Sequence, residues 1–323
     1  MKKRTNELVD SWNEILKAEK IVISCHVRPD GDALGSSLAL AHVLKACNKN
    51  VTFVSPDGVG ENYDFIEESN TVVSNTDERD FDLGILVDCE NTNRIGNAVE
   101  IITSAKRTAC IDHHIPDGMF GDIRIVDPKA SATAEVLCRL FEENNVEIDQ
   151  ICASQLLTGL IADTGAFRFA NTTADTFRIA ADLTQRGASP SQISRNVYDN
   201  KPLRALKLLG KTLDSIQTDP DGFVAWAVIT LDDFNQYSTS DSDTDSIVNQ
   251  VGAIRGPKVS ILFREIEPKL IRVSLRSRGG VDVNKVARLF DGGGHAAAAG
   301  CTIYTSLQEA EKVLIDEVLK WKA

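Results

Sequence analysis

The chain has 323 residues, of which 42% are hydrophobic and 25% charged, and its formal net charge is −12. This length exceeds what one hydrophobic core usually organises, so we expect two domains. The composition is that of a globular protein, and no apolar run approaches the ~18 residues that cross a bilayer, which excludes a membrane protein. The acidic charge argues against binding long duplex nucleic acid, whose affinity comes mainly from Lys and Arg.

The N-terminus and the cysteines both indicate a cytoplasmic protein. The first 20 residues have the pattern of an amphipathic helix, without the continuous apolar core and cleavage site of a signal peptide. The seven cysteines are an odd number, include no C-x-x-C pair and lie mostly in apolar stretches. We therefore expect them to be reduced core residues.

Short apolar runs alternate with helical or turn-rich stretches in the first half of the chain. After the N-terminal helix, strands are predicted at 20–25, 51–54, 83–87, 108–111 and 123–126, with a helix at about 35–48. From 131 to about 186 apolar residues recur at three- and four-residue spacing, which predicts helices. This order predicts an α/β domain over 1–190, with a mostly parallel sheet flanked by helices.

The second half predicts a linker and a smaller domain. Residues 191–215 are polar at first and then helical, which suits a linker with a helix. Residues 216–323 contain the strand-like runs FVAWAVITL, KVSILFREI and LIRVSLRS and the helical runs VNKVARLF and SLQEAEKVLIDEVLKW. We expect a second α/β domain there, with the active site in a cleft between the two domains.

A histidine and two aspartates follow the first predicted strand within seven residues. His26, Asp30 and Asp32 lie on a predicted loop bent by Pro29 and Gly31. Open α/β sheets bind their ligands at the carboxyl ends of strands. Mixed nitrogen and oxygen donors suit divalent ions such as Mn²⁺. The alternative is a turn with solvated aspartates and a helix N-cap.

Two further predicted strands end in residues of the same kinds. Asp88 ends the third strand, where it is either a ligand or a cap, and Arg94 follows as a candidate phosphate contact. The fourth strand ends in Asp112, His113 and His114. Because neighbouring side chains on an extended backbone point to opposite sides, one histidine can bind metal while the other faces the substrate.

Asp163 lies in GLIADTGAFRF, inside an otherwise apolar helical stretch. A buried aspartate needs a partner, so a metal ligand is favoured here over a helix C-cap or a hydrogen-bonded core residue. His42, alone within a predicted helix, is interpreted as a packed or solvated residue and not as a ligand.

The second domain carries a candidate substrate site. Arg276 and Arg278 end a strand-like run, and a glycine run that includes Gly293 and Gly294 precedes His295. A glycine-rich loop lets backbone amides approach a phosphate closely. The alternative is an ordinary turn, but two arginines and a histidine nearby favour binding of a phosphorylated substrate.

Five motifs in this order, HVRPDGDALGS, VDCENTNRIG, DHHIP, GLIADTGAF and GGGHAAAAG, resemble the DHH phosphoesterase superfamily with its second, DHHA1-type domain. The resemblance covers nearly the whole chain. Length and motif order look most like the branch of small oligoribonucleases that degrade nanoRNA and, in many bacteria, dephosphorylate 3′-phosphoadenosine 5′-phosphate. The chain departs from a common pattern in having Ala296 and Ala297 after His295, where polar or basic residues often stand.

The resemblance implies a pair of Mn²⁺ ions, with Mg²⁺ or Co²⁺ as alternatives. It implies that one ion is held by His26, Asp30 and Asp88, and the other by Asp32, Asp88, His113 and Asp163. His114 would face the scissile phosphate, and Asp112 would orient the histidine pair. The implied substrate contacts are Arg94, Arg276, Gly293, Gly294 and His295, with Arg278 as a helper.

The implied reaction is hydrolysis of short oligoribonucleotides and linear dinucleotides to mononucleotides, and of 3′-phosphoadenosine 5′-phosphate to AMP, by a water activated between two metals. The alternatives are a manganese pyrophosphatase, whose second domain would carry a clamp of Lys and Arg, a single-strand exonuclease, which would need further nucleic-acid-binding parts, and a non-catalytic nucleotide-sensing scaffold. The expected partner is short RNA or a phosphorylated nucleotide, not a membrane or a long duplex. A homodimer is left open.

Overall fold

The computed structural model describes residues 2–115, 118, 120–244 and 247–322. The chain divides into two compact units, Met1–Asn200 and Lys201–Ala323. The segment expected as a linker is divided between them. Helix α7 (Pro190–Ser194) and the π-helical turn η4 (Arg195–Asp199) belong to the first unit, and α8 (Leu203–Asp214) belongs to the second.

The first unit is built on a five-stranded sheet in the order β2-β1-β3-β4-β5, and all of its strand pairs are parallel. The strands are β1 (Lys20–Ser24), β2 (Asn50–Val54), β3 (Leu83–Val87), β4 (Arg107–Asp112) and β5 (Ile123–Val126). Their Ile- and Val-rich sequences suit a sheet that is covered on both faces. The predicted α/β fold is thereby confirmed, and the carboxyl ends of all five strands lie along one edge.

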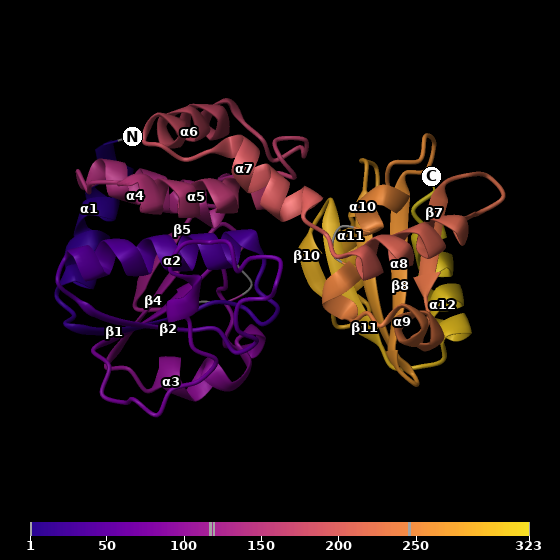
Figure 1. The fold of residues 1–323 in the computed structure, drawn as a ribbon, viewed down its shortest axis with the longest axis horizontal. Coiled ribbons are helices and arrows are strands. Elements are labelled where there is room, and N and C mark those ends of the chain that lie inside the picture. The colour runs from indigo at the N-terminus through magenta and orange to yellow at the C-terminus, as the bar shows by residue number, and fades with distance from the viewer. Residues whose placement is uncertain (1, 116–117, 119, 245–246, 323) are drawn as a thin grey trace. The chain divides into compact units, whose positions relative to one another are not determined.

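Helices cover both faces of this sheet, as Figure 1 shows. One face carries α2 and α4, with α5 and α6 beyond them, and the short α3 lies on the opposite face. The helices of this unit not yet given are α1 (Lys2–Leu16), α2 (Gly31–Ala46), α3 (Val99–Thr103), α4 (Thr133–Glu143), α5 (Gln150–Asp163) and α6 (Ala174–Gln185). The main core lies between the sheet and α2, α4 and α5.

Helix α2 begins four residues earlier than the apolar pattern predicted, which corrects the placement of Asp32. The Asp30 side chain accepts hydrogen bonds from the Asp32 and Ala33 amides, so Asp30 is the N-cap. The expectation of a loop at Asp32 was therefore wrong, because the cap extends the helix to Gly31. Asp32 lies in the first turn and is wholly buried.

Two glycines allow α2 and α5 to approach closely beside Asp32. A Cβ on Gly35 would lie 2.4 Å from the Gln155 carbonyl oxygen, and one on Gly159 would lie 2.5 Å from Asp32 Oδ1. Larger residues would separate the helices and displace the carboxylate. The glycines thus set the position of a candidate ligand.

His42, which the sequence did not favour as a ligand, joins three segments of the first unit. Its Nδ1 donates to Glu68 and its Nε2 to Asp149, each at 2.9 Å. Burial lowers the pKa of His42, but the hydrogen bonds to Glu68 and Asp149 raise it by more, so the pKa lies above its ordinary value. Because Asp149 is also the N-cap of α5, this imidazolium ties α2 to the start of α5.

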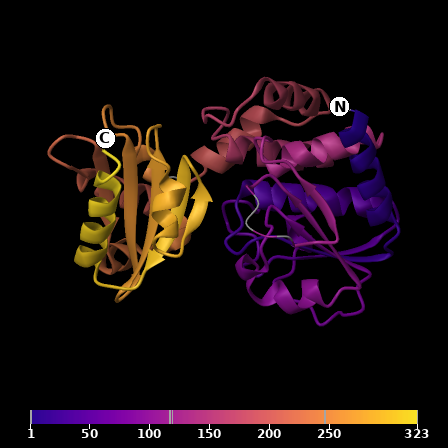
Figure 2. The same ribbon diagram turned by 180° about the vertical axis from the view of Figure 1, so that it is seen from behind.

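The second unit has a six-stranded mixed sheet in the order β10-β11-β9-β8-β7-β6, in which only β7 and β8 pair in parallel. Its strands are β6 (Gln217–Thr218), β7 (Val224–Ile229), β8 (Val259–Glu267), β9 (Leu270–Ser277), β10 (Gly293–His295) and β11 (Ala298–Ile303). Besides α8, its helices are α9 (Leu231–Tyr237), α10 (Ile247–Val251), α11 (Val283–Arg288) and α12 (Leu307–Leu319). One core joins the sheet to α8, α9 and α10, and the other joins it to α11 and α12, the yellow helix in front in Figure 2.

The glycine run before His295 was expected to be a loop, and this is wrong for its last residues. Residues 293–295 form β10, which pairs with β11. A Cβ on Gly292 would lie 2.2 Å from the Gly300 carbonyl oxygen, and Gly294 has a φ of +139°. The glycines are therefore needed for the tight strand pairing itself.

Among the described residues, no helix combines the length and the apolar character that crossing a membrane requires.

Candidate metal centre

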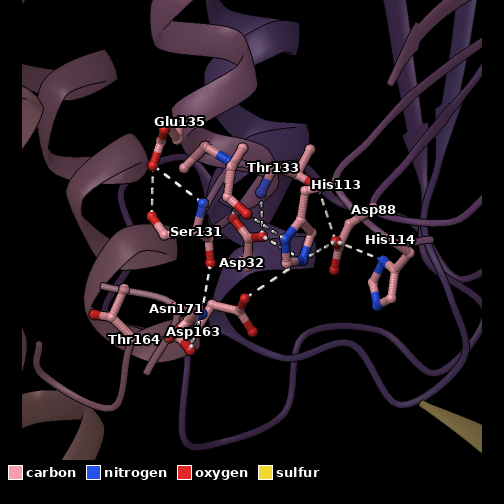
Figure 3. Close-up of polar contacts among 12 residues, drawn as sticks. Asp32, Asp88, His113, His114, Ser131, Thr133, Glu135, Asp163, Thr164 and Asn171 are labelled. Carbon is pink, nitrogen blue, oxygen red and sulfur yellow. Dashed lines mark hydrogen bonds and ion pairs between the residues drawn. The ribbon is translucent and has the colours of Figure 1, made fainter. Parts of the chain in front are cut away.

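Three neighbouring strands of the parallel sheet end in the residues that the sequence singled out. His26 follows β1, Asp88 follows β3 directly, and Asp112 is the last residue of β4. The Asp88 amide donates to the Ile111 carbonyl at 3.0 Å, which holds the end of β3 against β4. The sheet therefore gathers these side chains at its carboxyl edge, where open α/β sheets bind ligands. Figure 3 shows one of them, Asp88, beside His113 and His114.

Asp88 is the central anion of this cluster. Its Oδ1 accepts a hydrogen bond from Thr133 Oγ1 at 2.8 Å and lies 3.6 Å from both His113 Nε2 and His114 Nδ1. Its Oδ2 lies 3.5 Å from His26 Nε2. Burial raises the pKa of Asp88, but the contact with His26 and the charges of His114 and His113 lower it below its ordinary value. Asp88 is thus an anion surrounded by imidazole groups.

The side chain of Asp32 accepts hydrogen bonds from two helices, α2 and α4. Its Oδ1 accepts from Ser36 Oγ at 2.9 Å and from the Ala134 amide at 3.0 Å, and its Oδ2 accepts from the Thr133 amide at 2.6 Å. Burial and the charge of Asp88 raise the pKa of Asp32 to about 7. A cation bound here would remove that penalty.

Asp163 ends α5 and faces the same cluster. Its Oδ2 lies 3.4 Å from His113 Nε2, which is also 4.0 Å from Asp32 Oδ2. Burial and then the charges of Asp32, Asp30 and Asp88 raise the pKa of Asp163 well above its ordinary value. The carboxylates therefore repel one another strongly when no cation lies between them.

Asp112 accepts hydrogen bonds from both residues of the histidine pair. Its Oδ1 accepts from the His113 amide at 2.7 Å, from the His114 amide at 3.0 Å and from His114 Nδ1 at 2.7 Å. His113 Nδ1 donates to the Ala130 carbonyl at 3.3 Å, which turns its Nε2 toward the carboxylates. Burial lowers the pKa of His114, but Asp112 and Asp88 raise it more, to about 9.

The donor atoms fit divalent ions. His26, Asp30 and Asp88 can bring one donor atom each within 4.8 Å of one another, as can Asp32, His113 and Asp163. Several of the separations, from 3.4 to 4.0 Å, are long for hydrogen bonds. Neighbouring donors around an octahedral ion with ~2.1 Å bonds lie ~3 Å apart, so these gaps can accept an ion after small adjustments. The cluster brings together every candidate ligand predicted from the sequence.

The predicted substrate residues occur in both units. Arg94 is exposed in the first unit, in the 3₁₀ turn after β3. In the second unit Arg276 pairs across the sheet with Ala298, which in turn pairs with His295, so these side chains share one face. Arg278 instead donates to the Ile254 carbonyl at 2.9 Å.

Sequence reasoning missed the residues that support the cluster from α4. ATAEVLCRLFEE was interpreted only as a helix, but its Thr133 contacts both Asp32 and Asp88. No capping motif marked this turn, since the N-cap Ala132 makes no side-chain cap hydrogen bond and Glu135 instead accepts from the Ser131 amide four residues before it. Nothing local indicated that this turn faces residues 101 and 45 positions away in the chain.

Comparison with known proteins identifies the family. The DHH family, N-terminal domain, matches residues 20–160, and the DHHA1 domain matches residues 222–322. The chain is 33% identical over 292 residues to the bifunctional oligoribonuclease and PAP phosphatase NrnA of Thermus thermophilus, covering 90% of this chain and 86% of that protein. It is 31% identical over 306 residues to the protein of the same name in Bacillus subtilis, covering 92% and 93%.

A solved structure is similar in fold over nearly the whole chain. The crystal structure of an exopolyphosphatase-related protein from Bacteroides fragilis matches with a TM-score of 0.89 and 28% identity, over 98% of this chain and 96% of that one. Together with the two domain matches, the similarity extends over both units. The chain therefore belongs to the DHH family of phosphoesterases with a DHHA1 domain, and is an enzyme similar to relatives named as oligoribonucleases and PAP phosphatases.

Proposed function

We propose that the chain is a Mn²⁺-dependent phosphoesterase that hydrolyses short oligoribonucleotides and linear dinucleotides to mononucleotides, and 3′-phosphoadenosine 5′-phosphate to AMP. The observation that carries this proposal is the position of Asp88, an anion within 3.6 Å of three histidine nitrogens at the carboxyl edge of the sheet. The names of the relatives in Thermus thermophilus and Bacillus subtilis favour these substrates.

We assign one ion to His26, Asp30 and Asp88, and a second to Asp32, His113 and Asp163, with Asp88 shared between them. The mixture of imidazole nitrogens and carboxylate oxygens suits Mn²⁺, with Mg²⁺ and Co²⁺ as alternatives. When bound, such ions supply an acidified water as the nucleophile and offset the charge that develops on the phosphoryl oxygens.

His114 is the protein group assigned to the reacting phosphate. Its Nδ1 is held by Asp112, so the ring orientation is set before the substrate arrives. We assign its Nε2 as the donor of a charge-assisted hydrogen bond from the imidazolium to a phosphoryl oxygen. A preset donor of this kind costs no reorganisation during the reaction.

The second unit is assigned to substrate grip. Arg276 and His295 share a face of the sheet, and Arg276 Nε donates to Asn249 Oδ1 at 3.0 Å, which fixes the plane of the guanidinium. A fixed guanidinium recognises the planar arrangement of phosphate oxygens. Arg94 is assigned to a phosphate contact in the first unit, and Gly293 and Gly294 to close approach of the backbone.

Two properties of the whole chain favour short substrates. Aromatic residues make up 6% of the chain and the net charge is −12. Extended single strands are usually held by a positive groove with stacking aromatic residues. Additional nucleotides are therefore expected to add little binding energy and some electrostatic repulsion.

The location of the enzyme is also a proposal. All seven cysteines have free thiols, which is usual for proteins of the reducing cytoplasm. We place the enzyme there, together with its short RNA substrates.

The test is hydrolysis by chelator-treated protein supplied with Mn²⁺, Mg²⁺ or Co²⁺. The substrates are RNA of two to five nucleotides, 3′-phosphoadenosine 5′-phosphate, pyrophosphate and a long single strand. We expect Mn²⁺ to restore turnover of the first two and not of pyrophosphate. Preferred turnover of pyrophosphate would contradict the proposal and indicate a pyrophosphatase, and preferred turnover of the long strand would indicate a single-strand exonuclease.

A further inference from the structure

The first turn of α4 contacts two candidate metal ligands that come from different elements. The Thr133 amide donates to Asp32 Oδ2 at 2.6 Å, and the Ala134 amide donates to Asp32 Oδ1 at 3.0 Å. The Thr133 hydroxyl donates to Asp88 Oδ1 at 2.8 Å. One residue thus reaches the carboxylate in α2 and the carboxylate after β3, as Figure 3 shows.

These contacts matter because the two carboxylates are not fixed by regular structure alone. Asp88 has a φ of +56°, so the chain has left the strand geometry that would direct its side chain. Asp32 is buried beside it, so when both carboxylates are ionised, repulsion would turn them apart. The donors of α4 hold the oxygens of both carboxylates that face this helix, and so they oppose that rotation. The other oxygen of Asp88 stays directed toward His26.

The turn itself is held by a buried polar network. Glu135 is wholly buried, and its Oε2 accepts from the Ser131 amide at 3.1 Å and the Ser131 hydroxyl at 2.6 Å. Thr176 Oγ1 on α6 donates to Ser131 Oγ at 3.0 Å, and Arg139 forms an ion pair with the other Glu135 oxygen. The turn is therefore bound on its side away from the metal centre.

The same network reaches a third candidate ligand. Asn171 Nδ2 donates to the Ser131 carbonyl at 2.9 Å and to the Asp163 carbonyl at 3.1 Å. The end of α5, which carries Asp163, is thus tied to the segment that precedes Thr133. A buried charged network of this kind contributes little net stability compared with apolar packing. Its geometric effect is to place three carboxylates relative to one another.

We propose that Thr133 is a positioning residue of the metal centre, which sets the orientations of Asp88 and Asp32, and that Glu135 holds Thr133 in place. This inference rests on the proposed function, because it assigns metal binding to the two aspartates. Thr133 itself contacts no metal and no substrate in this assignment. Its effect is transmitted through the carboxylates that it orients.

The experiment compares Thr133→Val, which removes the hydroxyl at nearly constant shape, with Thr133→Ser, which restores it. The matched control is Thr212→Val, because Thr212 is also buried and helical, but its hydroxyl donates only to the Leu208 carbonyl at 2.8 Å in the second unit. Each variant is assayed for Mn²⁺ affinity by calorimetry, for kcat and KM on an RNA dinucleotide, and for melting temperature without metal.

We expect Thr133→Val to bind Mn²⁺ about 10- to 100-fold more weakly and to lose kcat, as changes to the partners of metal ligands usually do. KM should change little, Thr133→Ser should recover most of both losses, and Thr212→Val should show neither loss. Unchanged Mn²⁺ affinity in Thr133→Val, or an equal loss in Thr212→Val, would overturn the positioning role while leaving the proposed function intact.

Two further outcomes are distinguishable. If Thr133→Val does not fold, Glu135→Gln serves in its place, since it keeps the side-chain size and weakens the hold on the turn. Reduced Mn²⁺ affinity in Glu135→Gln supports the inference, and unchanged affinity overturns it. If the wild-type protein neither binds Mn²⁺ nor hydrolyses the dinucleotide, the proposed function fails, and this inference fails with it.

Discussion

Replacing Asp163 by Asn should stabilise the metal-free protein while weakening its response to Mn²⁺. Asp163 is 24% exposed and lies among like charges, with an oxygen within 4.8 Å of one from Asp32. The substitution keeps the shape of the side chain and removes one of the repelling charges. It also removes a proposed ligand, so stability and metal binding should change in opposite directions.

The size of the effect follows from these distances. Two unit charges 4.8 Å apart repel by ~3.5 kcal/mol at an effective dielectric constant of about 20. Partial exposure and the positive charge of His114 reduce this to about 1–2 kcal/mol. Because the first unit spans 200 residues, such a gain should raise its melting temperature by about 2–8 °C.

The stability advantage of metal-free Asp163→Asn over the wild type should change with pH in a defined direction. The folded protein raises the pKa of Asp163, so the ionised carboxylate costs folding free energy above its ordinary pKa. Below about pH 4 the carboxyl is protonated in the folded and unfolded states alike, and the variant should lose its advantage. The advantage should grow as the pH rises toward the raised pKa.

The assay is thermal unfolding with chelator and with excess Mn²⁺, at several pH values. Each bound ion at 100 times its dissociation constant adds about 2.7 kcal/mol to the wild-type protein, so the order of stability should invert when Mn²⁺ is added. Asp10→Asn, at an exposed position on α1, is the control. It should change neither the melting temperature without metal nor the response to Mn²⁺. A lower melting temperature of metal-free Asp163→Asn, or a full wild-type response to Mn²⁺, would refute the reasoning.

Three further predictions concern other parts of the molecule. Asp88→Asn should retain the fold, since Asn tolerates a φ of +56°, but keep less than a few per cent of wild-type turnover with Mn²⁺. Arg276→Ala and His295→Ala should each lower kcat/KM by about 10- to 150-fold, the equivalent of losing ~1.5–3 kcal/mol of charge-assisted contact, with unchanged Mn²⁺ stoichiometry. His42→Gln should destabilise the protein by about 1–2 kcal/mol at pH 6, measured by denaturant unfolding. Because the pKa of His42 is raised in the folded state, this difference should shrink as the pH rises through that pKa.

Each of these predictions has an outcome that contradicts it. Substantial turnover in Asp88→Asn would remove the shared-ligand assignment. Loss of bound Mn²⁺ in His295→Ala would count against a role confined to substrate grip. A His42→Gln difference that grows with pH would mean that His42 acts as a neutral hydrogen-bonding group and not as an imidazolium.

The parallel sheet could be predicted because its signals are local. The apolar run at 83–87 coincides with β3, and the run at 51–54 lies within β2. Strands of a parallel sheet end at the same edge, so His26, Asp88 and His113 were expected together before any distance was known. The grouping of these residues thus follows from strand order and periodicity.

Other features depend on contacts that periodicity does not encode. Asp32 was expected on a loop, because the apolar pattern of α2 starts later than the helix that Asp30 caps. Residues 293–295 were expected in a loop, because strand pairing with β11 is a tertiary contact. Thr133 was overlooked, since its partner Asp32 lies 101 residues away.

The central claim is that this enzyme is a metal-dependent hydrolase of short RNA. The most direct test is kcat/KM for 5′-labelled RNA of two, five, twelve and twenty-four nucleotides at fixed salt, with Mn²⁺ and with chelator. We predict that the value is highest for the shortest substrates, falls with length, and is abolished by the chelator. A flat or rising trend with length, or turnover that survives the chelator, would contradict the account.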